Sequence, residues 1–132
     1  MTYALDTNTL IYFFKGLGRV ADHLLARPPT DIAVPVVVVY EIDYGLARSE
    51  RPEAQREQLE SLLGTVDILP FDRDAASRAG QLRAALEREG RAIGPMDTLI
   101  AGTALAHGAT LVTHNTAEFR RVADLKVVDW FD

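Results

Sequence analysis

Four polar residues lie where expected strands end or where expected helices begin: Asp6 and Asn115 follow strands, Glu41 lies early in the helix after a strand, and Asp97 lies in the first turn of the helix opened by GPMD. Carboxylate and amide oxygens are the ligands that hard divalent cations prefer in proteins. Carboxylates that share one crevice repel one another, and either raised pKa values or a bound cation relieves that repulsion. Because the chain has no cysteine, we expect such a site to hold Mg²⁺ or Mn²⁺ rather than Zn²⁺.

Short apolar segments alternate along the chain with segments of helical periodicity. The expected strands are 3–5, 31–34, 66–69, 110–112 and 126–128. The expected helices are 7–15, 20–26, 35–50, 52–64, a long one capped by Asp72, 96–107 and 118–122. This alternation predicts an α/β fold in which a parallel sheet is covered on both faces by helices. Such sheets bind ligands beyond the carboxyl ends of their strands, the edge where we expect the four polar residues and Thr113 to meet.

The segment 35–50 carries conflicting local signals. Its run of valines and its two tyrosines favour a strand by propensity. Pro35 at its start and the helical spacing of Val37, Glu41 and Tyr44 favour a helix. We predict a helix. A carboxylate near the buried face of such a valine-rich helix is costly unless it has a partner, so Glu41 is the acid that is hardest to explain by structure alone.

The other polar residues have plain structural alternatives. Asp6 precedes an expected helix and would serve as its N-cap, and Asp97 in a first helical turn is favoured by the helix dipole. Asn115 beside Thr113 is also typical of a polar turn. The capping and ligand interpretations both stay open here, and the convergence of these residues at one edge is what favours a site.

Composition limits the classes of protein that fit. At 132 residues with 48% hydrophobic side chains, the chain fits one domain, 1–132. Its longest apolar stretch, 32–40, is shorter than the ~20 residues of a membrane-spanning helix, and no basic leader precedes it, so we expect no membrane contact and a cytoplasmic location. A net charge of −5 and a pI of about 5.1 argue against holding nucleic acid by bulk electrostatics. They do not exclude an enzyme that meets phosphates through metal ions.

Four segments occur in order along the chain: LDTNTLIYF, VVVVYEIDYGLAR, IGPMDTLIAGTALAHGATLVTHNTAEFRRV and VVDW. Together they resemble the PIN domain family and, within it, the VapC-like ribonuclease toxins of bacterial toxin–antitoxin pairs. The resemblance covers essentially the whole chain. It implies a three-layer α/β sandwich with a central parallel five-stranded sheet and helices on both faces, and it implies that the segment 35–50 is helical.

By this resemblance, the chain is a divalent-metal-dependent endoribonuclease that cleaves RNA with a metal-activated water. The implied ligands of Mg²⁺ or Mn²⁺ are Asp6, Glu41 and Asp97. The fourth acidic position of the family falls on Asn115, which carries no charge, and Glu118 is expected to replace part of that charge or to be a surface acid at a helix start. Thr7 and Thr113 match supporting hydroxyl positions. His114 would approach the substrate or be incidental to the turn.

The resemblance also implies partners. RNA would be the substrate, and a small antitoxin would insert a basic residue into the acidic site, with DNA bound only indirectly through that antitoxin. The resemblance implies a homodimer as well. The apolar faces of 9–20 and 52–64 are compatible with this, since they exceed what one small sheet needs for cover and would form a subunit or antitoxin surface. Arg91 and Lys15 are candidates for RNA contacts at the rim.

Three rival interpretations come from other classes. A haloacid-dehalogenase-like phosphatase also has an Asp after its first strand but expects a second acid two positions on, where this chain has Asn8. A metal-dependent adhesion module of the von Willebrand type uses Asp-x-Ser-x-Ser, and Asn8 and Leu10 occupy the hydroxyl positions. A catalytically degraded PIN-like protein that binds RNA or acts as a scaffold is the third, and Asn115 favours it.

Overall fold

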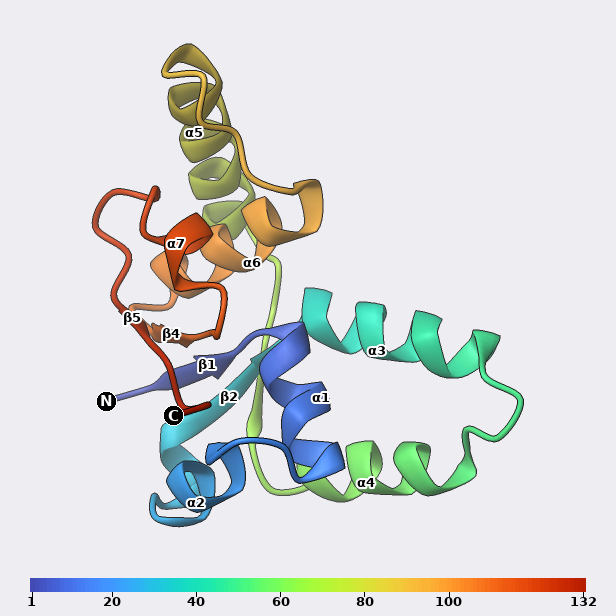
Figure 1. Cartoon of the computed structure of the whole chain (residues 1–132). Coiled ribbons are helices and arrows are strands. Elements are labelled where there is room, and N and C mark those ends of the chain that lie inside the picture. The colour runs from blue at the N-terminus through green and yellow to red at the C-terminus, as the bar shows by residue number, and fades with distance from the viewer.

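The computed structural model describes residues 1–132 as a parallel sheet between layers of helices (Figure 1). The strands are β1 (Tyr3–Leu5), β2 (Ile32–Pro35), β3 (Asp67–Leu69), β4 (Thr110–Val112) and β5 (Val127–Val128). Their order across the sheet is β3-β2-β1-β4-β5, and every neighbouring pair is parallel. The predicted α/β fold is therefore confirmed, including the five-stranded sheet that the family resemblance implied.

Seven α-helices and one short 3₁₀ helix connect the strands. They are α1 (Thr7–Lys15), α2 (Val20–Leu25), the 3₁₀ helix (Pro29–Asp31), α3 (Val36–Arg48), α4 (Glu53–Leu63), α5 (Arg73–Arg88), α6 (Pro95–Ala106) and α7 (Thr116–Phe119). Figure 1 shows α1, α2 and α4 on one side of the sheet and α5, α6 and α7 on the other. The helix α3 runs outward from the sheet and α4 returns toward it. None of these helices is long and apolar enough to cross a membrane.

Side-chain caps begin the helices α1 and α5, and a glycine ends α1. The Asp6 carboxylate accepts a hydrogen bond from the Thr9 backbone N–H at 2.9 Å and so begins α1. Gly16, with φ of 67°, ends that helix in the left-handed conformation that glycine adopts without strain. Asp72 begins α5 in the same way, through the Ala75 N–H at 2.9 Å. The predicted capping by Asp6 and Asp72 is confirmed.

The valine-rich segment is helical over Val36–Arg48, as predicted. Val38, Ile42 and Leu46 recur at helical spacing and are almost fully buried. Packing of this face against the core outweighs the strand propensity of the valines. Pro35 ends β2 and immediately precedes the helix, so the chain turns from strand to helix without a loop.

Most predicted boundaries differ from the observed ones by one to three residues, and two of these differences have a local cause. The strand expected at 31–34 lies at Ile32–Pro35, because residue 31 belongs to the 3₁₀ helix. The short helix expected at 118–122 lies at Thr116–Phe119, because the turn after β4 is closed at once by a hydrogen bond from the Asn115 N–H to the Thr113 hydroxyl at 3.0 Å. This second shift places Glu118 inside the first turn of α7.

The central strands hold the hydrophobic core and end at the polar edge. Ala4 and Leu5 of β1 and Leu111 and Val112 of β4 are completely buried, as expected for strands covered on both faces. They belong to a cluster of 24 buried residues that joins the sheet to both helix layers. The rigid ends of these strands therefore fix the residues that follow them, Asp6 and Thr113.

Candidate active site

The carboxyl ends of β1, β2 and β4 meet at one edge of the sheet and bring the predicted polar residues together. Leu5 pairs with Val112, so the next residues, Asp6 and Thr113, lie side by side. Glu41 comes from the second turn of α3, which directly follows β2, and Asp97 comes from the first turn of α6. This is the convergence that the sequence predicted from the parallel arrangement.

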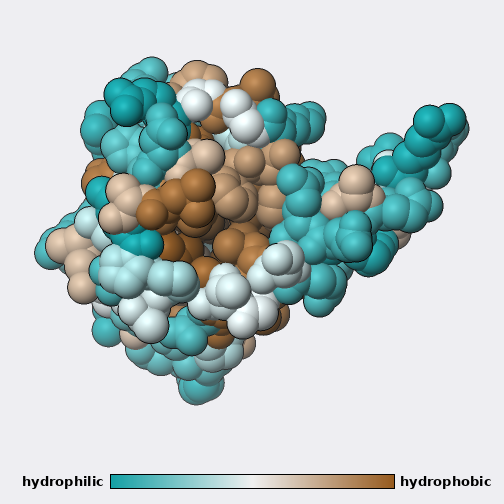
Figure 2. Space-filling model, turned by 90° about the horizontal axis from the view of Figure 1, so that it is seen from below, coloured by the Kyte–Doolittle hydropathy of each residue, from teal (hydrophilic) through white to brown (hydrophobic).

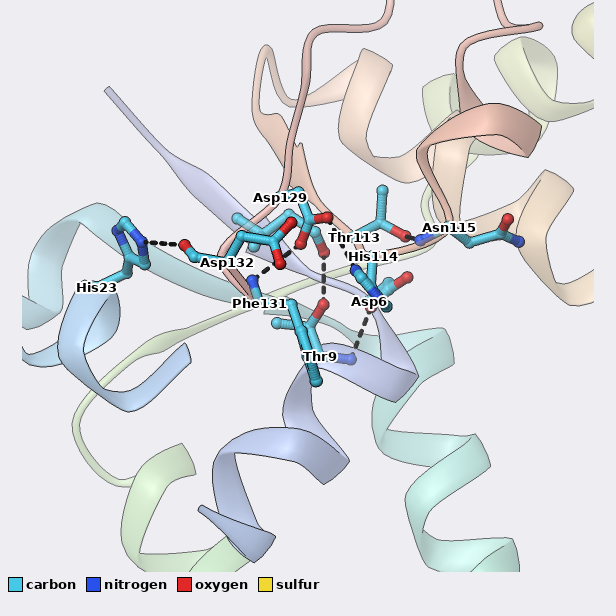
Figure 3. Close-up of polar contacts among 10 residues, drawn as sticks. Asp6, Thr9, His23, Thr113, His114, Asn115, Asp129, Phe131 and Asp132 are labelled. Atoms are coloured by element: carbon cyan, nitrogen blue, oxygen red, sulfur yellow. Dashed lines mark hydrogen bonds and ion pairs between the residues drawn. The ribbon is translucent and has the colours of Figure 1, made fainter. Parts of the chain in front are cut away.

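Asp6 is both a helix cap and a buried acid. Only 5% of the residue is exposed, and burial raises the pKa of its carboxyl above the usual value. Hydrogen bonding with Thr113 and Thr9 lowers the pKa again in part, while the negative charge of Glu41 raises it further. Figure 3 shows Asp6 between Thr9 and Thr113. The capping interpretation therefore accounts for one oxygen and leaves a buried carboxylate that is electrostatically linked to Glu41.

Glu41 is held by a hydroxyl from the neighbouring helix. The Thr7 hydroxyl donates a hydrogen bond to Oε1 of Glu41, and both residues are half-buried. No hydrogen bond within the chain involves the other oxygen, Oε2. The structure thus brings Thr7 next to Glu41, which gives this carboxylate on a valine-rich helix the partner that it requires.

Asp97 is the acid on which the charges of the other three carboxylates act together. Its pKa is raised to about 7, first by burial, next by the charge and hydrogen bonding of Glu118, and then by the charges of Asp6 and Glu41. Burial and like charges at short range both raise the pKa of a carboxyl group. Four carboxylates, including Glu118, therefore act on one another at this edge of the sheet.

Glu118 is positioned by two donors. Its Oε1 accepts a hydrogen bond from the Gly94 backbone N–H at 2.9 Å, and its Oε2 accepts one from the Asn115 side-chain amide. Gly94 also lies against Asp97, since a Cβ at this glycine would be 3.3 Å from Oδ2 of Asp97. Glu118 thus stands beside Asp97, whereas the side chain of Asn115 extends away from Asp6 (Figure 3). The contact of Gly94 with Glu118 was not anticipated from the sequence, and no sequence signal pointed to it.

The oxygen ligands of this site are of the kind that a hard divalent cation binds. They do not form a closed coordination shell in this structure. No three acidic or histidine side chains converge at metal-ligand distance in this structure. The carboxylates nevertheless offer only oxygen ligands, and their mutual repulsion is the electrostatic condition that a cation relieves. Closing a shell around a cation would require rotation of these side chains.

The sequence offered three further candidates, His114, Arg91 and Lys15. His114 is exposed and its Nδ1 lies 2.8 Å from a carboxylate oxygen of Asp129, a partner that the sequence did not indicate. Arg91 is exposed in the loop before α6 and lies 3.7 Å from Glu89. Lys15 is at the far end of α1 from Thr7, so the structure does not bring it to the carboxylates.

Comparisons with known proteins agree with this geometry. The PIN domain family model matches residues 3–125. The tRNA(fMet)-specific endonuclease VapC of Shigella flexneri is 35% identical over 130 residues, which cover 98% of each chain. The crystal structure of DNA-bound VapBC from Salmonella typhimurium is similar, with 31% identity, a TM-score of 0.91 and 98% of each chain covered. VapBC2 of Rickettsia felis, solved with a DNA fragment from its promoter, has 36% identity and a TM-score of 0.88 over 98% of this chain and 99% of that one. The chain therefore belongs to the PIN domain family, within its VapC group.

Proposed function

We propose that the chain is a metal-dependent endoribonuclease and the toxin of a toxin–antitoxin pair. The observation that carries the proposal is the gathering of four carboxylates, from Asp6, Glu41, Asp97 and Glu118, at the carboxyl edge of the sheet, where the charges of the other three act on Asp97. The name of the Shigella flexneri relative, an endonuclease specific for a tRNA, supports RNA as the substrate class.

Asp6, Glu41 and Asp97 would hold Mg²⁺ or Mn²⁺, with Glu118 as a fourth acid. When bound, such a cation makes a water more acidic and neutralises charge on the phosphoryl and leaving oxygens. The chain's own contribution is to hold the carboxylates in place. Asp6 is fixed on the rigid end of β1, and burial keeps bulk water away from it. The charge of the bound cation would also let an acidic protein approach a polyanion.

Neighbouring hydroxyl and amide groups orient each carboxylate. The Thr7 hydroxyl holds Oε1 of Glu41, which leaves Oε2 available to accept a hydrogen bond from an attacking water. Asn115 holds Glu118. We propose that Asn115 supports the site by positioning this acid, so that the charge missing at position 115 is supplied three residues later.

A small antitoxin is the proposed partner, and the structure offers a surface for it. A groove of about 710 Å³ lies between α1, α2 and α4, with Phe13, Leu24, Leu25 and Leu62 among its lining residues. Figure 2 shows hydrophobic residues gathered in a hollow on this face. Both similar VapBC structures contain DNA, which supports DNA contact through the partner. A basic residue of the antitoxin would enter the acidic site and neutralise its carboxylates.

A homodimer is proposed on a different surface. Val36, Tyr40 and Tyr44 follow one another at four-residue spacing along α3 and are 39%, 60% and 56% exposed. Residues at this spacing share one helix face, and an exposed apolar stripe marks an interaction surface. The predicted α1 and α4 faces contribute Phe13 and Leu62 to the groove instead, so we assign them to the antitoxin and the α3 stripe to a second copy of the chain.

Cleavage of RNA by the purified chain, free of any partner, tests the proposal. We expect single-stranded RNA to be cut in Mn²⁺, cutting to stop in excess EDTA, and Mn²⁺ to restore it. The variant Asp6→Asn should be inactive, while Asp67→Asn, which changes an exposed acid in β3, should remain active.

The alternative, a degraded relative that only binds RNA, predicts no cutting under any of these conditions. Cutting that persists in EDTA would instead refute the metal dependence.

A further inference from the structure

His114 lies in the turn that follows β4, between two residues that contact the carboxylates, and its own ring is part of a stack of aromatic rings. It follows Thr113, which contacts Asp6, and precedes Asn115, which holds Glu118. Its ring stacks on Phe131 with 4.4 Å between centroids and 24° between planes. Tyr12 meets the two rings edge-on, at 6.1 Å from His114 and 5.1 Å from Phe131. Figure 3 shows His114 with its partner Asp129.

Asp129 fixes both members of this stack. Its Oδ2 lies 2.8 Å from Nδ1 of His114, and its Oδ1 accepts a hydrogen bond from the Phe131 backbone N–H at 2.9 Å. An Nδ1–H that donates to this carboxylate leaves Nε2 as the outward nitrogen. The ring is therefore held in one orientation before any ligand arrives, which reduces the entropy that binding would cost.

One face of the imidazole has no ring upon it. The side chain is 42% exposed, only Phe131 stacks on it, and no hydrogen bond within the chain involves Nε2. A ring that served only to fill the core would be covered on both faces. This one instead presents a flat aromatic surface and a free polar atom to solvent at the edge of the acidic site.

The C-terminal segment does not depend on His114 for its attachment. Trp130 is only 3% exposed, and its ring stacks with His23 at 5.7 Å and lies 4.6 Å from the guanidinium of Arg27. The Phe131 carbonyl accepts a hydrogen bond from the Arg19 N–H at 2.8 Å, and Gly18 lets the chain approach so closely that a Cβ there would be 2.6 Å from that oxygen. These contacts already hold the segment, so holding it does not explain the exposed imidazole.

We infer that the His114–Phe131 stack is a binding platform for a nucleobase of single-stranded RNA, next to the phosphate that is cut. This inference rests on the proposed function. A nucleobase has a flat π-face that stacks on exposed aromatic rings, and such stacking tolerates any base. A neutral base also suits a surface beside four carboxylates better than a bare phosphate does.

The experiment measures binding rather than cleavage. The full chain carries Glu41→Gln to suppress turnover, and a fluorescein-labelled single-stranded ten-nucleotide RNA is titrated in Mn²⁺ by fluorescence anisotropy. In this background, we expect His114→Ala to weaken RNA binding on the order of tenfold, the usual loss for one base stack. His114→Phe, which keeps an aromatic face but has no ring nitrogen, should bind within about twofold of the parent because stacking is retained.

A second readout reports the stack directly. An RNA that carries 2-aminopurine should lose fluorescence on binding when the probe occupies the platform, and His114→Ala should abolish this quenching at one position of the probe. Thermal unfolding of each variant controls for loss of fold, and Lys126→Ala, at an exposed residue next to β5, is a matched surface control.

Equal binding by the parent and His114→Ala, with both folded, would overturn the platform. Binding by His114→Phe as weak as that of His114→Ala would also overturn it, because the role would then belong to the ring nitrogen. Neither outcome concerns cleavage. The proposed nuclease activity fails separately, if the unmodified chain does not cut RNA in Mn²⁺.

Discussion

The raised pKa of Asp97 makes the stability of the protein depend on pH, and this dependence can be measured. Its folded pKa of about 7 lies above the ordinary value of 3.8, because of burial and the charges of Glu118, Asp6 and Glu41. The folded state therefore binds more protons than the unfolded state between these values. The free energy of unfolding of the metal-free protein should fall as pH rises from about 4 to about 7, and the loss should be complete above that range.

Asp97→Asn removes this loss of unfolding free energy, because an amide does not ionise. In EDTA we expect the variant to exceed the wild type in unfolding free energy at pH 8 by about 1 kcal/mol, a value discounted because the group is partly exposed. The gain should be clearly smaller at pH 4.5, where the wild-type group is protonated in the fold. Urea unfolding at the two pH values measures it, with Asp67→Asn as the control. An equal gain at both pH values would show that Asp97 is not repelled by its neighbours.

Glu118 and Asn115 provide a second test at this scale. If Glu118 supplies the charge missing at position 115, Glu118→Gln should weaken Mn²⁺ binding strongly, and Asn115→Ala should weaken it about tenfold because it releases Glu118, as loss of an outer-shell partner does. Isothermal titration calorimetry measures both affinities. Unchanged affinity in Glu118→Gln would remove this acid from the site, and Glu89→Gln, an exposed acid in the α5–α6 loop, is the control.

Part of the site could be predicted residue by residue. Asp6, Glu41 and Asp97 lie at the end of a parallel strand or in the first two turns of a helix, and a sequence reveals such positions. The contacts of Glu118 could not be predicted in the same way. They depend on a two-residue shift in the start of α7 and on a backbone N–H of Gly94, which no pattern of residue types encodes.

At the scale of elements, α6 is held in place by a close approach to α5. Gly102 of α6 lies against Ala79 of α5, and a Cβ at this glycine would be 2.7 Å from Cβ of Ala79. Because α6 carries Asp97 in its first turn, this contact fixes the helix that presents one of the four carboxylates.

Gly102→Ala should destabilise the fold by about 1–3 kcal/mol, the usual cost of overpacking. Gly80→Ala is the matched control, because a methyl group added at Gly80 of α5 would meet no heavy atom of another element within 4 Å and Ala is the better helix former. It should raise the free energy of unfolding by about 0.4–1 kcal/mol. Urea denaturation measures the free energy of unfolding of the two variants. A Gly102→Ala protein as stable as Gly80→Ala would contradict the close packing of α5 on α6.

The elements themselves were largely predictable. Asp6 and Asp72 were recognisable as candidate caps of α1 and α5. In the segment 35–50, Pro35 and the helical spacing of Val37, Glu41 and Tyr44 predicted the helix against the strand propensity of the valines. Boundaries were less certain where a turn was closed by a side chain, as at Thr113. There, one hydroxyl contact determines where the next helix begins.

At the scale of the whole molecule, two apolar surfaces remain outside the core, and they have different shapes. The groove between α1, α2 and α4 is concave, which suits an inserted segment of a partner. The stripe of Val36, Tyr40 and Tyr44 is a single helix face, which suits a second copy of the same surface related by two-fold symmetry. The order of the sheet was predictable only as parallel, since strand order depends on contacts far apart in sequence.

Tyr44→Glu tests the assignment of the stripe. Placing a charge in an apolar subunit contact should convert a dimer to a monomer at micromolar concentration, because the carboxylate would be desolvated without a partner. Multi-angle light scattering measures the mass of the partner-free chain. Leu17→Glu, at an exposed leucine in the turn after α1, should leave the dimer intact. A wild-type chain that is already monomeric would contradict the dimer.

The most direct test of the central claim is the initial rate of single-stranded RNA cleavage as a function of Mn²⁺ concentration, in the wild type and in Asp97→Asn. We predict that the wild-type rate is at background in EDTA and rises to saturation with Mn²⁺, as expected when oxygen ligands hold the cation. We predict that Asp97→Asn stays near background throughout, although it is folded and at least as stable as the wild type without metal. Wild-type cleavage that does not depend on Mn²⁺, or an Asp97→Asn variant that cleaves at the wild-type rate, would contradict the account.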